Sequence, residues 1–356
     1  MHFCQNIGSI IYFLNLLRPF RYLCKSMRKK FSVGIALVLG LVFSMSACDN
    51  EVDINADWKE ILVVYGLLDP LDSVQYIKIN KAFLNENENA LKVAQNPDSL
   101  FIKDAKVTLL HINSGTIIDL ERVNEIQKDP GIFAQNPNYL YKTTVPILEN
   151  EPYKLTVESK LTGQKVEAVT WTLRKARIEA PFKSSNPTFS LGAKFIVISY
   201  VPGWNSYAYD IKMRVKIDEY NRQDTGFLRT RDLTWNVITN YVVQRNTTAA
   251  VLHQIERESF MQFLASSLDT SRNIVRRFKH VSVEYYGGSQ NLIDYISVNE
   301  PSIGIVQKTA EYSNIEGGMG LFGSRCRQEI GTSNFEPASV GILQNNKLTA
   351  PLNFIR

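Results

Sequence analysis

The chain has few of the residues from which catalytic and metal centres are usually built. Its 356 residues include only four histidines and four cysteines. His111, His253 and His280 stand in unrelated contexts, without the second histidine that a zinc-binding helix requires. No serine stands in the Gly-x-Ser-x-Gly turn that presents the nucleophile of many hydrolases. The sequence therefore predicts no catalytic residue, metal or other cofactor, although two carboxylates brought together only by folding would leave no pattern in a sequence.

Long apolar runs are also missing, and none reaches the roughly 20 residues that span a bilayer as a helix. The run from Phe31 to Phe43 follows a basic triplet and ends shortly before Cys48. A basic segment, a short apolar segment and small residues before the cleavage site are typical of a secretory signal peptide. Translation is expected to start at Met27, where this signal begins, so residues 1–47 comprise an upstream extension and a signal peptide. A genuine N-terminal extension is the alternative.

The basic excess of the chain is confined to this first segment. The formal net charge is +5, but six basic residues and no acidic residue precede Cys48. The remaining chain carries 34 basic and 35 acidic residues, so its charge indicates no nucleic-acid partner. One basic cluster lies outside the signal, and its side chains are interpreted as a solvated face: Arg272, Arg276, Arg277 and Lys279.

Ser46 and Ala47, directly before Cys48, resemble the end of the lipobox of bacterial lipoproteins, although Met45 stands where that motif prefers leucine. The resemblance implies that Cys48 becomes the acylated first residue of the mature chain. Each buried methylene of an acyl chain contributes about 0.8 kcal/mol, so two or three chains would hold the protein at a membrane. An ordinary cleaved signal is the alternative. Cys326 is then the last free cysteine, and we expect a buried structural thiol there.

The residues that follow Cys48 indicate a location. Asp49, Glu51 and Asp53 form an acidic tract that resembles the one in Bacteroidota lipoproteins exported to the cell surface. In enterobacteria, by contrast, an aspartate directly after the cysteine implies retention at the inner membrane. We expect a lipid-anchored protein of the outer membrane at the cell surface, with the periplasmic face as the alternative.

Short apolar runs typical of β-strands follow the acidic tract. Seven such runs between Ile61 and Thr172 are separated by turn residues, which favours an immunoglobulin-like sandwich. Apolar and polar residues alternate strictly over 153–158, as expected of a strand with one buried face. Gly115 and Gly163 are expected in hairpin turns.

The chain is predicted to contain two β-domains. The sandwich covers 48–175, and prolines with clustered serine and asparagine predict a linker at 176–192. The larger second domain, 193–356, has longer strands and two short helices, at 259–268, which a capping box opens, and at 290–298. The predicted fold class is all-β with a few short helices.

A glycine-rich stretch near the C-terminus has the spacing of a dinucleotide-binding loop, Gly318-x-Gly320-x-x-Gly323. That loop needs a strand before it, a helix after it and an acidic residue about 20 positions further on. No helical pattern follows here, and the residue at that distance is Leu343. The glycines are therefore interpreted as a turn or bulge that allows positive φ angles or a close approach of two backbones.

The same stretch resembles the C-terminal signature of a Bacteroidota lipoprotein family that is catalogued as a domain of unknown function. The residues that match it are Asn314, Ile315, Gly317, Gly318, Gly320, Phe322 and Gly323. The resemblance implies a structural role for these residues. Members of that family are often encoded beside TonB-dependent outer-membrane receptors, which implies an accessory role in nutrient uptake with such a receptor as partner.

The leading hypothesis is a lipid-anchored accessory or binding protein without catalytic activity. A surface hydrolase that acts on glycan or peptide is the alternative, and a structural component of the envelope is a third. A deep pocket with converging carboxylates or histidines would favour the hydrolase, whereas a shallow aromatic patch would favour binding. The sequence indicates neither the ligand nor the oligomeric state.

Overall fold

The computed structural model describes residues 61–82, 94–102, 104–299 and 311–356. All of them belong to one compact unit, Lys59–Arg356. The predicted signal peptide, Cys48 and the acidic tract lie outside the described residues, and so do residues 83–93, which follow the second strand.

Strands are the main regular structure of the described chain, and the predicted all-β class with a few short helices is confirmed. The strands are β1 (Ile61–Leu68), β2 (Gln75–Ala82), β3 (Ala105–His111), β4 (Thr116–Asp119), β5 (Glu121–Val123), β6 (Leu140–Thr143), β7 (Pro152–Ser159), β8 (Lys165–Trp171), β9 (Arg177–Ala180), β10 (Phe195–Val201), β11 (Ala208–Asn221), β12 (Phe227–Val242), β13 (Val251–Glu256), β14 (Ile274–Gly288) and β15 (Met319–Thr332). The helices are α3 (Pro97–Leu100), α4 (Arg257–Ser267), α5 (Gln290–Asn299), α6 (Pro337–Asn345) and the 3-10 helix η2 (Ala350–Leu352).

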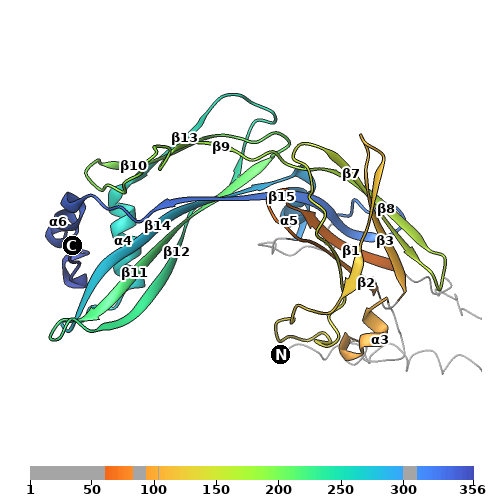
Figure 1. Ribbon diagram of the computed structural model, residues 1–356, viewed down its shortest axis with the longest axis horizontal. Helices are drawn as coiled ribbons and strands as arrows, with labels where there is room; N and C mark the ends of the chain where they lie inside the picture. The colour runs from red at the N-terminus through yellow and green to blue at the C-terminus, as the bar shows by residue number, and fades with distance from the viewer. Residues whose placement is uncertain (1–60, 83–93, 103, 300–310) are drawn as a thin grey trace, which may run out of the picture. The chain divides into compact units, whose positions relative to one another are not determined.

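The strands form three sheets (Figure 1). The largest has eight strands in the order β12-β11-β14-β15-β1-β2-β6-β5. The second has the order β4-β3-β7-β8, and the third has the order β13-β10-β9. Neighbouring strands are antiparallel except β1 and β15, which pair in parallel with Val63 opposite Met319. The first and last strands of the described chain therefore lie side by side in the middle of the large sheet.

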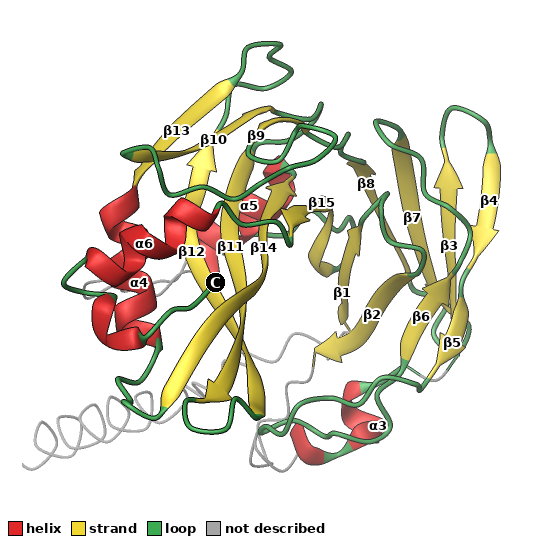
Figure 2. Ribbon diagram, turned by 60° about the vertical axis from the view of Figure 1, so that its left-hand side comes forward, coloured by secondary structure: helices red, strands yellow, loops and turns green. Residues whose placement is uncertain are grey.

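Two hydrophobic cores lie against this sheet. The first is the predicted sandwich, in which side chains from β1 and β2, among them Leu62 and Ile77, pack with those of β3, β7 and β8. The second joins the long strands β11 and β14 to β10, α4 and α6. Figure 2 shows α4 and α6 beside these long strands, and Phe260 of α4 and Leu343 of α6 are fully buried there. Each core thus buries one face of the strands that surround it.

The predicted division into a sandwich, a linker and a second domain needs correction in two respects. The segment 176–192 contains β9 and contributes Phe182, Phe189 and Leu191 to the second core, so it is an integral part of that core. Ile315 and Phe322, from the predicted second domain, are buried in the first core. Because the large sheet is continuous, residues on both sides of the predicted linker share one sheet.

The predicted turns are confirmed, but the helices differ in detail. Gly115 and Gly163 have φ angles of 72° and 68° in the hairpins β3–β4 and β7–β8. The capping box predicted at Ser259 is absent, because β13 runs directly into α4 and the N-cap is Glu256 without a side-chain hydrogen bond. The region 193–356 also contains α6 and η2, which the two-helix prediction missed.

Candidate functional site

The glycines of the C-terminal signature let β15 lie against β1. Gly317 and Gly320 have φ angles of 78° and 115°, a region that side chains disfavour. A Cβ atom on Gly320 would overlap the carbonyl oxygen of Val64, and one on Gly318 would lie 2.7 Å from the carbonyl oxygen of Leu62. The prediction of positive φ and close backbone approach is confirmed. The strand β15 follows, not a helix, so the phosphate-binding interpretation is excluded.

The other signature residues fix the same strand. The Asn314 side chain accepts a hydrogen bond from the backbone N–H of Phe322 at 2.9 Å and donates one to its carbonyl oxygen at 2.7 Å. Ile315 and Phe322 are buried in the first core. A Cβ on Gly323 would lie 3.2 Å from Ser289 Oγ. The signature is therefore a structural element that closes the sheet between β1 and β14.

His111 lies between a serine and a glutamate, an arrangement that resembles a catalytic triad. Its Nδ1 is 2.7 Å from Ser114 Oγ, and its Nε2 is 3.1 Å from Glu151 Oε2. Ser114 Oγ, however, also lies 2.8 Å from Thr116 Oγ1 and accepts a hydrogen bond from the Thr116 backbone N–H. Ser114 is exposed on the β3–β4 turn, so these contacts are explained by the stability of the hairpin and do not by themselves identify a nucleophile.

The remaining sequence candidates lie apart from one another. His253 is on β13, between the rings of Tyr200 and Tyr241, and burial lowers its pKa. His280 is on β14, 3.0 Å from Ser333 Oγ. Cys326 is buried, and burial raises its pKa to about 12, so the predicted structural thiol is confirmed. Among the described residues, no group of three or more histidine, cysteine, aspartate or glutamate side chains could hold a metal ion.

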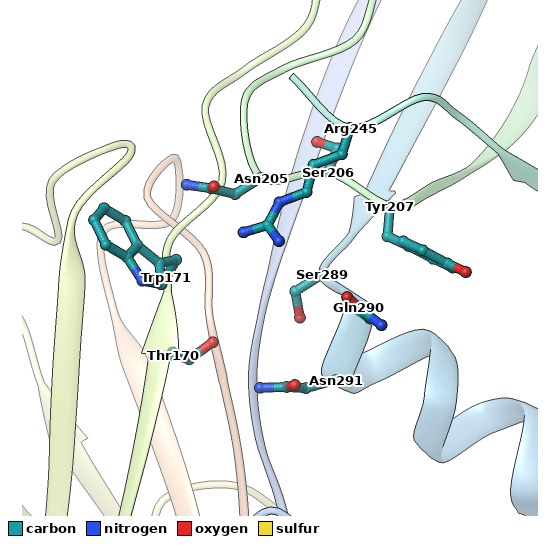
Figure 3. Close-up of a pocket in the computed structure, with 9 residues that line it drawn as sticks. All are labelled: Thr170, Trp171, Asn205, Ser206, Tyr207, Arg245, Ser289, Gln290 and Asn291. Carbon is teal, nitrogen blue, oxygen red and sulfur yellow. The ribbon is translucent and has the colours of Figure 1, made fainter. Parts of the chain in front are cut away.

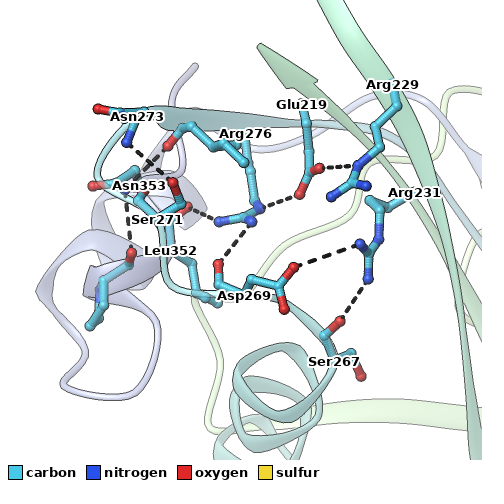
Figure 4. A network of polar contacts seen from close by, with 12 residues as sticks. Glu219, Arg229, Arg231, Ser267, Asp269, Ser271, Asn273, Arg276, Leu352 and Asn353 are labelled. Carbon is cyan, nitrogen blue, oxygen red and sulfur yellow. Dashed lines mark hydrogen bonds and ion pairs between the residues drawn. The ribbon is translucent and has the colours of Figure 1, made fainter. Parts of the chain in front are cut away.

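The basic cluster of the sequence is not uniformly solvated, which corrects the interpretation of Arg276. Its side chain is fully buried, with Nε 2.8 Å from Glu219 Oε1. Its other nitrogens donate to the carbonyl oxygens of Leu352 and Asp269, both at 2.9 Å, as Figure 4 shows. The neighbouring Arg277 is exposed. Arg276 therefore ties β11 and β14 to the C-terminal segment and is not part of a binding surface.

A polar recess of about 180 Å³ opens where β8, the loop before β11 and the start of α5 meet (Figure 3). Trp171, at the end of β8, is 47% exposed at its rim. The recess is lined by Thr170, Trp171, Asn205, Ser206, Tyr207, Arg245, Ser289, Gln290 and Asn291. We call it the Trp171 recess. None of these described lining residues is an acid, a histidine or a cysteine.

Several walls of the Trp171 recess are held in place by hydrogen bonds. Asn205, with a φ angle of 65°, donates through Nδ2 to Asn150 Oδ1 at 2.9 Å and to the carbonyl oxygen of Thr172 at 3.2 Å. Ser289 Oγ accepts from the backbone N–H of Ser324 at 3.1 Å. Figure 3 shows the Arg245 guanidinium pointing into the space between Trp171 and α5. The recess can offer an aromatic face, amides, hydroxyls and one cation to a polar ligand.

A second recess, of about 610 Å³, is lined in part by the loop before β11. Arg174, Lys175, Ala176, Arg177, Ile178, Val201, Pro202, Gly203, Trp204, Thr247, Thr248 and Gln328 line it. We call it the basic recess, because its charged lining residues are all cations. These cations are Arg174, Lys175 and Arg177. They lie in or beside the segment 176–192, which was predicted to be a linker, and this is why sequence reasoning did not select them.

Comparison with known proteins adds little to this geometry. No protein-family model and no curated protein matches the chain. Among solved structures, the C-terminal globular domain of an oligosaccharyltransferase from Pyrococcus abyssi matches with a TM-score of 0.21 and 12% identity, over 64% of this chain and 46% of that one. The FN1–FN3 domains of chicken CNTN1 match with a TM-score of 0.18 and 9% identity, over 75% of this chain and 64% of that one. The chain thus spans less than two thirds of either structure.

No helix in the described ranges combines the length and apolar character needed to cross a membrane.

Proposed function

We propose that the protein is a lipid-anchored accessory protein of the outer membrane that binds a polar ligand and works with a TonB-dependent receptor in nutrient uptake. The lipobox at Cys48 and the acidic tract after it support the anchor. The C-terminal signature supports the receptor partnership, through the family that it resembles. The ligand is bound by the protein and is not altered by it.

The Trp171 recess is the observation that carries the binding role. The half-exposed indole of Trp171 leaves apolar surface in contact with water, which is unfavourable. A ligand ring or chain that covers the indole removes this surface from water and thereby gains binding free energy. Within the described ranges, the side chains of Arg245 and Gln290 form no hydrogen bond or ion pair, so their donors can serve a ligand. General acid or base catalysis needs a titratable group near the ligand. The lining of this recess offers an aromatic ring, amides, hydroxyls and a guanidinium, which suits binding better than hydrolysis.

The surface hydrolase is the second candidate, and the contacts of His111 are the observation that favours it. Ser114, His111 and Glu151 have the residue types of a triad at hydrogen-bonding distance. We rank this candidate lower because Ser114 is exposed on the β3–β4 turn, where its hydroxyl also contacts Thr116, whereas substrate sites are usually concave. Hydrolysis of a surface glycan or peptide by the purified mature protein, lost in Ser114→Ala, would promote it over the binding role.

Replacing Cys48 with alanine is expected to block lipidation, because no thiol then remains to be acylated at the lipobox. The measurement is partition of the expressed protein between detergent and aqueous phases, with its size determined by mass spectrometry. The variant should be uncleaved or soluble. Cys326→Ala is the matched control, since it removes the buried thiol and should leave partition unchanged. A processed Cys48→Ala protein that still enters the detergent phase would contradict the anchor.

Removing the Trp171 indole and the Arg245 guanidinium together is expected to lower receptor-dependent uptake at least about tenfold. An aromatic contact and a charged hydrogen bond each contribute about 1 kcal/mol or more, and 1.4 kcal/mol is tenfold in affinity. The test compares growth and uptake in cells that carry Trp171→Ala/Arg245→Ala with those that carry Leu161→Ala, which removes a side chain that is 86% exposed.

A pull-down of the tagged protein from native membranes separates the two parts of this proposal. A TonB-dependent receptor should be recovered with the wild type and also with the Trp171→Ala/Arg245→Ala variant, because the variant alters the recess and not the anchor. Failure to recover any such receptor with the wild type would refute the partnership. Normal uptake by the double variant would refute the role of the Trp171 recess.

A further inference from the structure

The three cations of the basic recess, Arg174, Lys175 and Arg177, form a cationic run whose backbone is held in place by contacts with other segments. The backbone N–H of Arg174 donates to the carbonyl oxygen of Trp204 at 3.0 Å. A Cβ on Gly203 would overlap the carbonyl group of Arg174, so this close approach requires glycine. Gln328 accepts from the backbone N–H of Ala176 at 2.6 Å and donates to its carbonyl oxygen at 3.0 Å. The side chains at 174, 175 and 177 therefore project from an ordered backbone, which reduces the entropy lost when a ligand binds.

The charges of the run are only partly balanced by acids. Arg177 pairs with Glu179 at 2.8 Å, and Glu179 is shared with Lys183. Glu149 accepts from the backbone N–H of Lys175 at 3.2 Å. Within the described ranges, no carboxylate lies within ion-pair distance of the side chains of Arg174 and Lys175, and no acidic residue lines the recess. Cations lining a concave surface raise the local concentration of anions.

The remaining walls of the basic recess suit a ring with hydroxyl groups. Trp204 is 43% exposed and presents a flat apolar ring. Thr247 and Thr248 supply hydroxyls, which can both donate and accept hydrogen bonds. A volume of about 610 Å³ is far larger than a single phosphate or sulfate needs, so it fits a ligand of several linked groups.

We propose that the basic recess binds an acidic saccharide, with Arg174 and Lys175 holding its anionic groups, Trp204 covering one face of a sugar ring, and the threonines bonded to its hydroxyls. The proposal rests on the proposed function only in taking the protein to be a binding protein. It assigns a ligand class to the basic recess, which is a different site from the Trp171 recess. The anionic group is a carboxylate of a uronic acid or a sulfate ester, and the experiment separates these two sources.

The test measures binding of three polymers to the mature chain without its lipid: polygalacturonate for carboxylate, dextran sulfate for sulfate, and neutral dextran. The wild type should bind at least one acidic polymer and not dextran. Arg174→Gln/Lys175→Gln should weaken that binding about tenfold or more, since it removes both unpaired cations. Arg272→Gln/Lys347→Gln is the matched control, because it removes the same charges from exposed positions elsewhere and should change binding less than twofold.

Trp204→Ala tests the sugar ring separately from the charge. It should weaken binding of the acidic polymer several-fold, and the loss should persist at 0.5 M salt, where exposed charges are largely screened. Equal losses in both charge variants would mean a general charge effect and overturn the site. The proposed site would also be overturned if vesicles of anionic lipid bound the protein more tightly than either acidic polymer. An unchanged affinity of Trp204→Ala for the acidic polymer would overturn it as well. Recovery of the receptor in the pull-down is independent of all these outcomes.

Discussion

Arg276→Met is expected to lower the free energy of unfolding by about 3 to 5 kcal/mol, because it leaves the fully buried carboxylate of Glu219 without its buried partner. Methionine preserves much of the volume and none of the charge. Arg229 would remain as the second partner at 2.7 Å, but its side chain is 52% exposed and its attraction is weakened by water. The carbonyl oxygens of Leu352 and Asp269 would also lose their donors, so the variant should loosen the C-terminal segment drawn in Figure 4.

Urea unfolding of the purified protein measures this effect, with Arg277→Met as the matched control. Arg277 is the exposed neighbour on the same strand, so its replacement should change the stability by less than about 0.5 kcal/mol. The double variant Glu219→Leu/Arg276→Met should recover much of the loss, because a buried ion pair replaced by apolar side chains is often neutral. A single Arg276→Met variant as stable as the control would mean that Glu219 does not depend on this pair.

The same variant should show a distinct pH dependence. Although burial alone would raise the pKa of Glu219, Arg229 and Arg276 hold it below the usual value. A lowered folded-state pKa contributes stability that is present above the unfolded-state pKa and is lost as the pH falls. The difference in stability between the wild type and Arg276→Met should therefore be largest near neutral pH and narrow below about pH 4.

Gly320→Ala is expected to prevent folding or to lower the melting temperature by more than about 10 °C. The residue combines a φ angle of 115° with a backbone approach so close that a methyl group would overlap the carbonyl oxygen of Val64. Relief of that overlap must separate β15 from β1, which removes parallel pairing in the middle of the large sheet. A strained backbone and lost pairing together exceed the usual cost of one substitution.

The control for this variant is Gly341→Ala. Gly341 lies in α6, and a Cβ there meets nothing within 4 Å. Alanine is the better helix former by about 1 kcal/mol, so this variant should be as stable as the wild type or slightly more stable. Both are measured by thermal unfolding followed by circular dichroism. A melting temperature for Gly320→Ala within about 2 °C of the wild type would show that β1 and β15 do not need this close approach.

The strands could be predicted from the sequence because their signal is local. The alternation in 153–158 coincides with β7, whose inward residues, among them Leu155 and Val157, are buried. The role of the signature glycines could also be predicted, since repeated glycine in a strand indicates a close neighbour. What the glycines approach could not be predicted, because Val64 is distant in the sequence.

The errors arose where local composition competes with tertiary packing. Prolines and serines predicted a linker at 176–192, but Phe189 of that segment contacts Phe260 and Phe335. Arg276 was grouped with its basic neighbours. It directly precedes the exposed Arg277 on the same strand, and because successive side chains of a strand point to opposite faces, Arg276 faces the core. A buried arginine requires a partner such as Glu219, which no single sequence identifies.

The candidate site was predictable only in part. Alternation along β8 places Val166 and Ala168 inward and Trp171 outward, so an exposed indole could be expected. The Trp171 recess itself is assembled from four separate segments of the chain, and no spacing in the sequence links them. The basic recess likewise joins Arg174 to Thr248 and Gln328.

The pairing of β1 with β15 also sets the order in which the chain can complete its structure. The Ser324 hydroxyl donates to the carbonyl oxygen of Leu68, which is 256 residues away. Closing so long a loop costs conformational entropy before the contact returns any energy, which slows folding. A growing chain must therefore keep the edge of β1 unpaired until β15 has been synthesised. Products that end before Met319 leave that edge open to other chains, which is a route to aggregation.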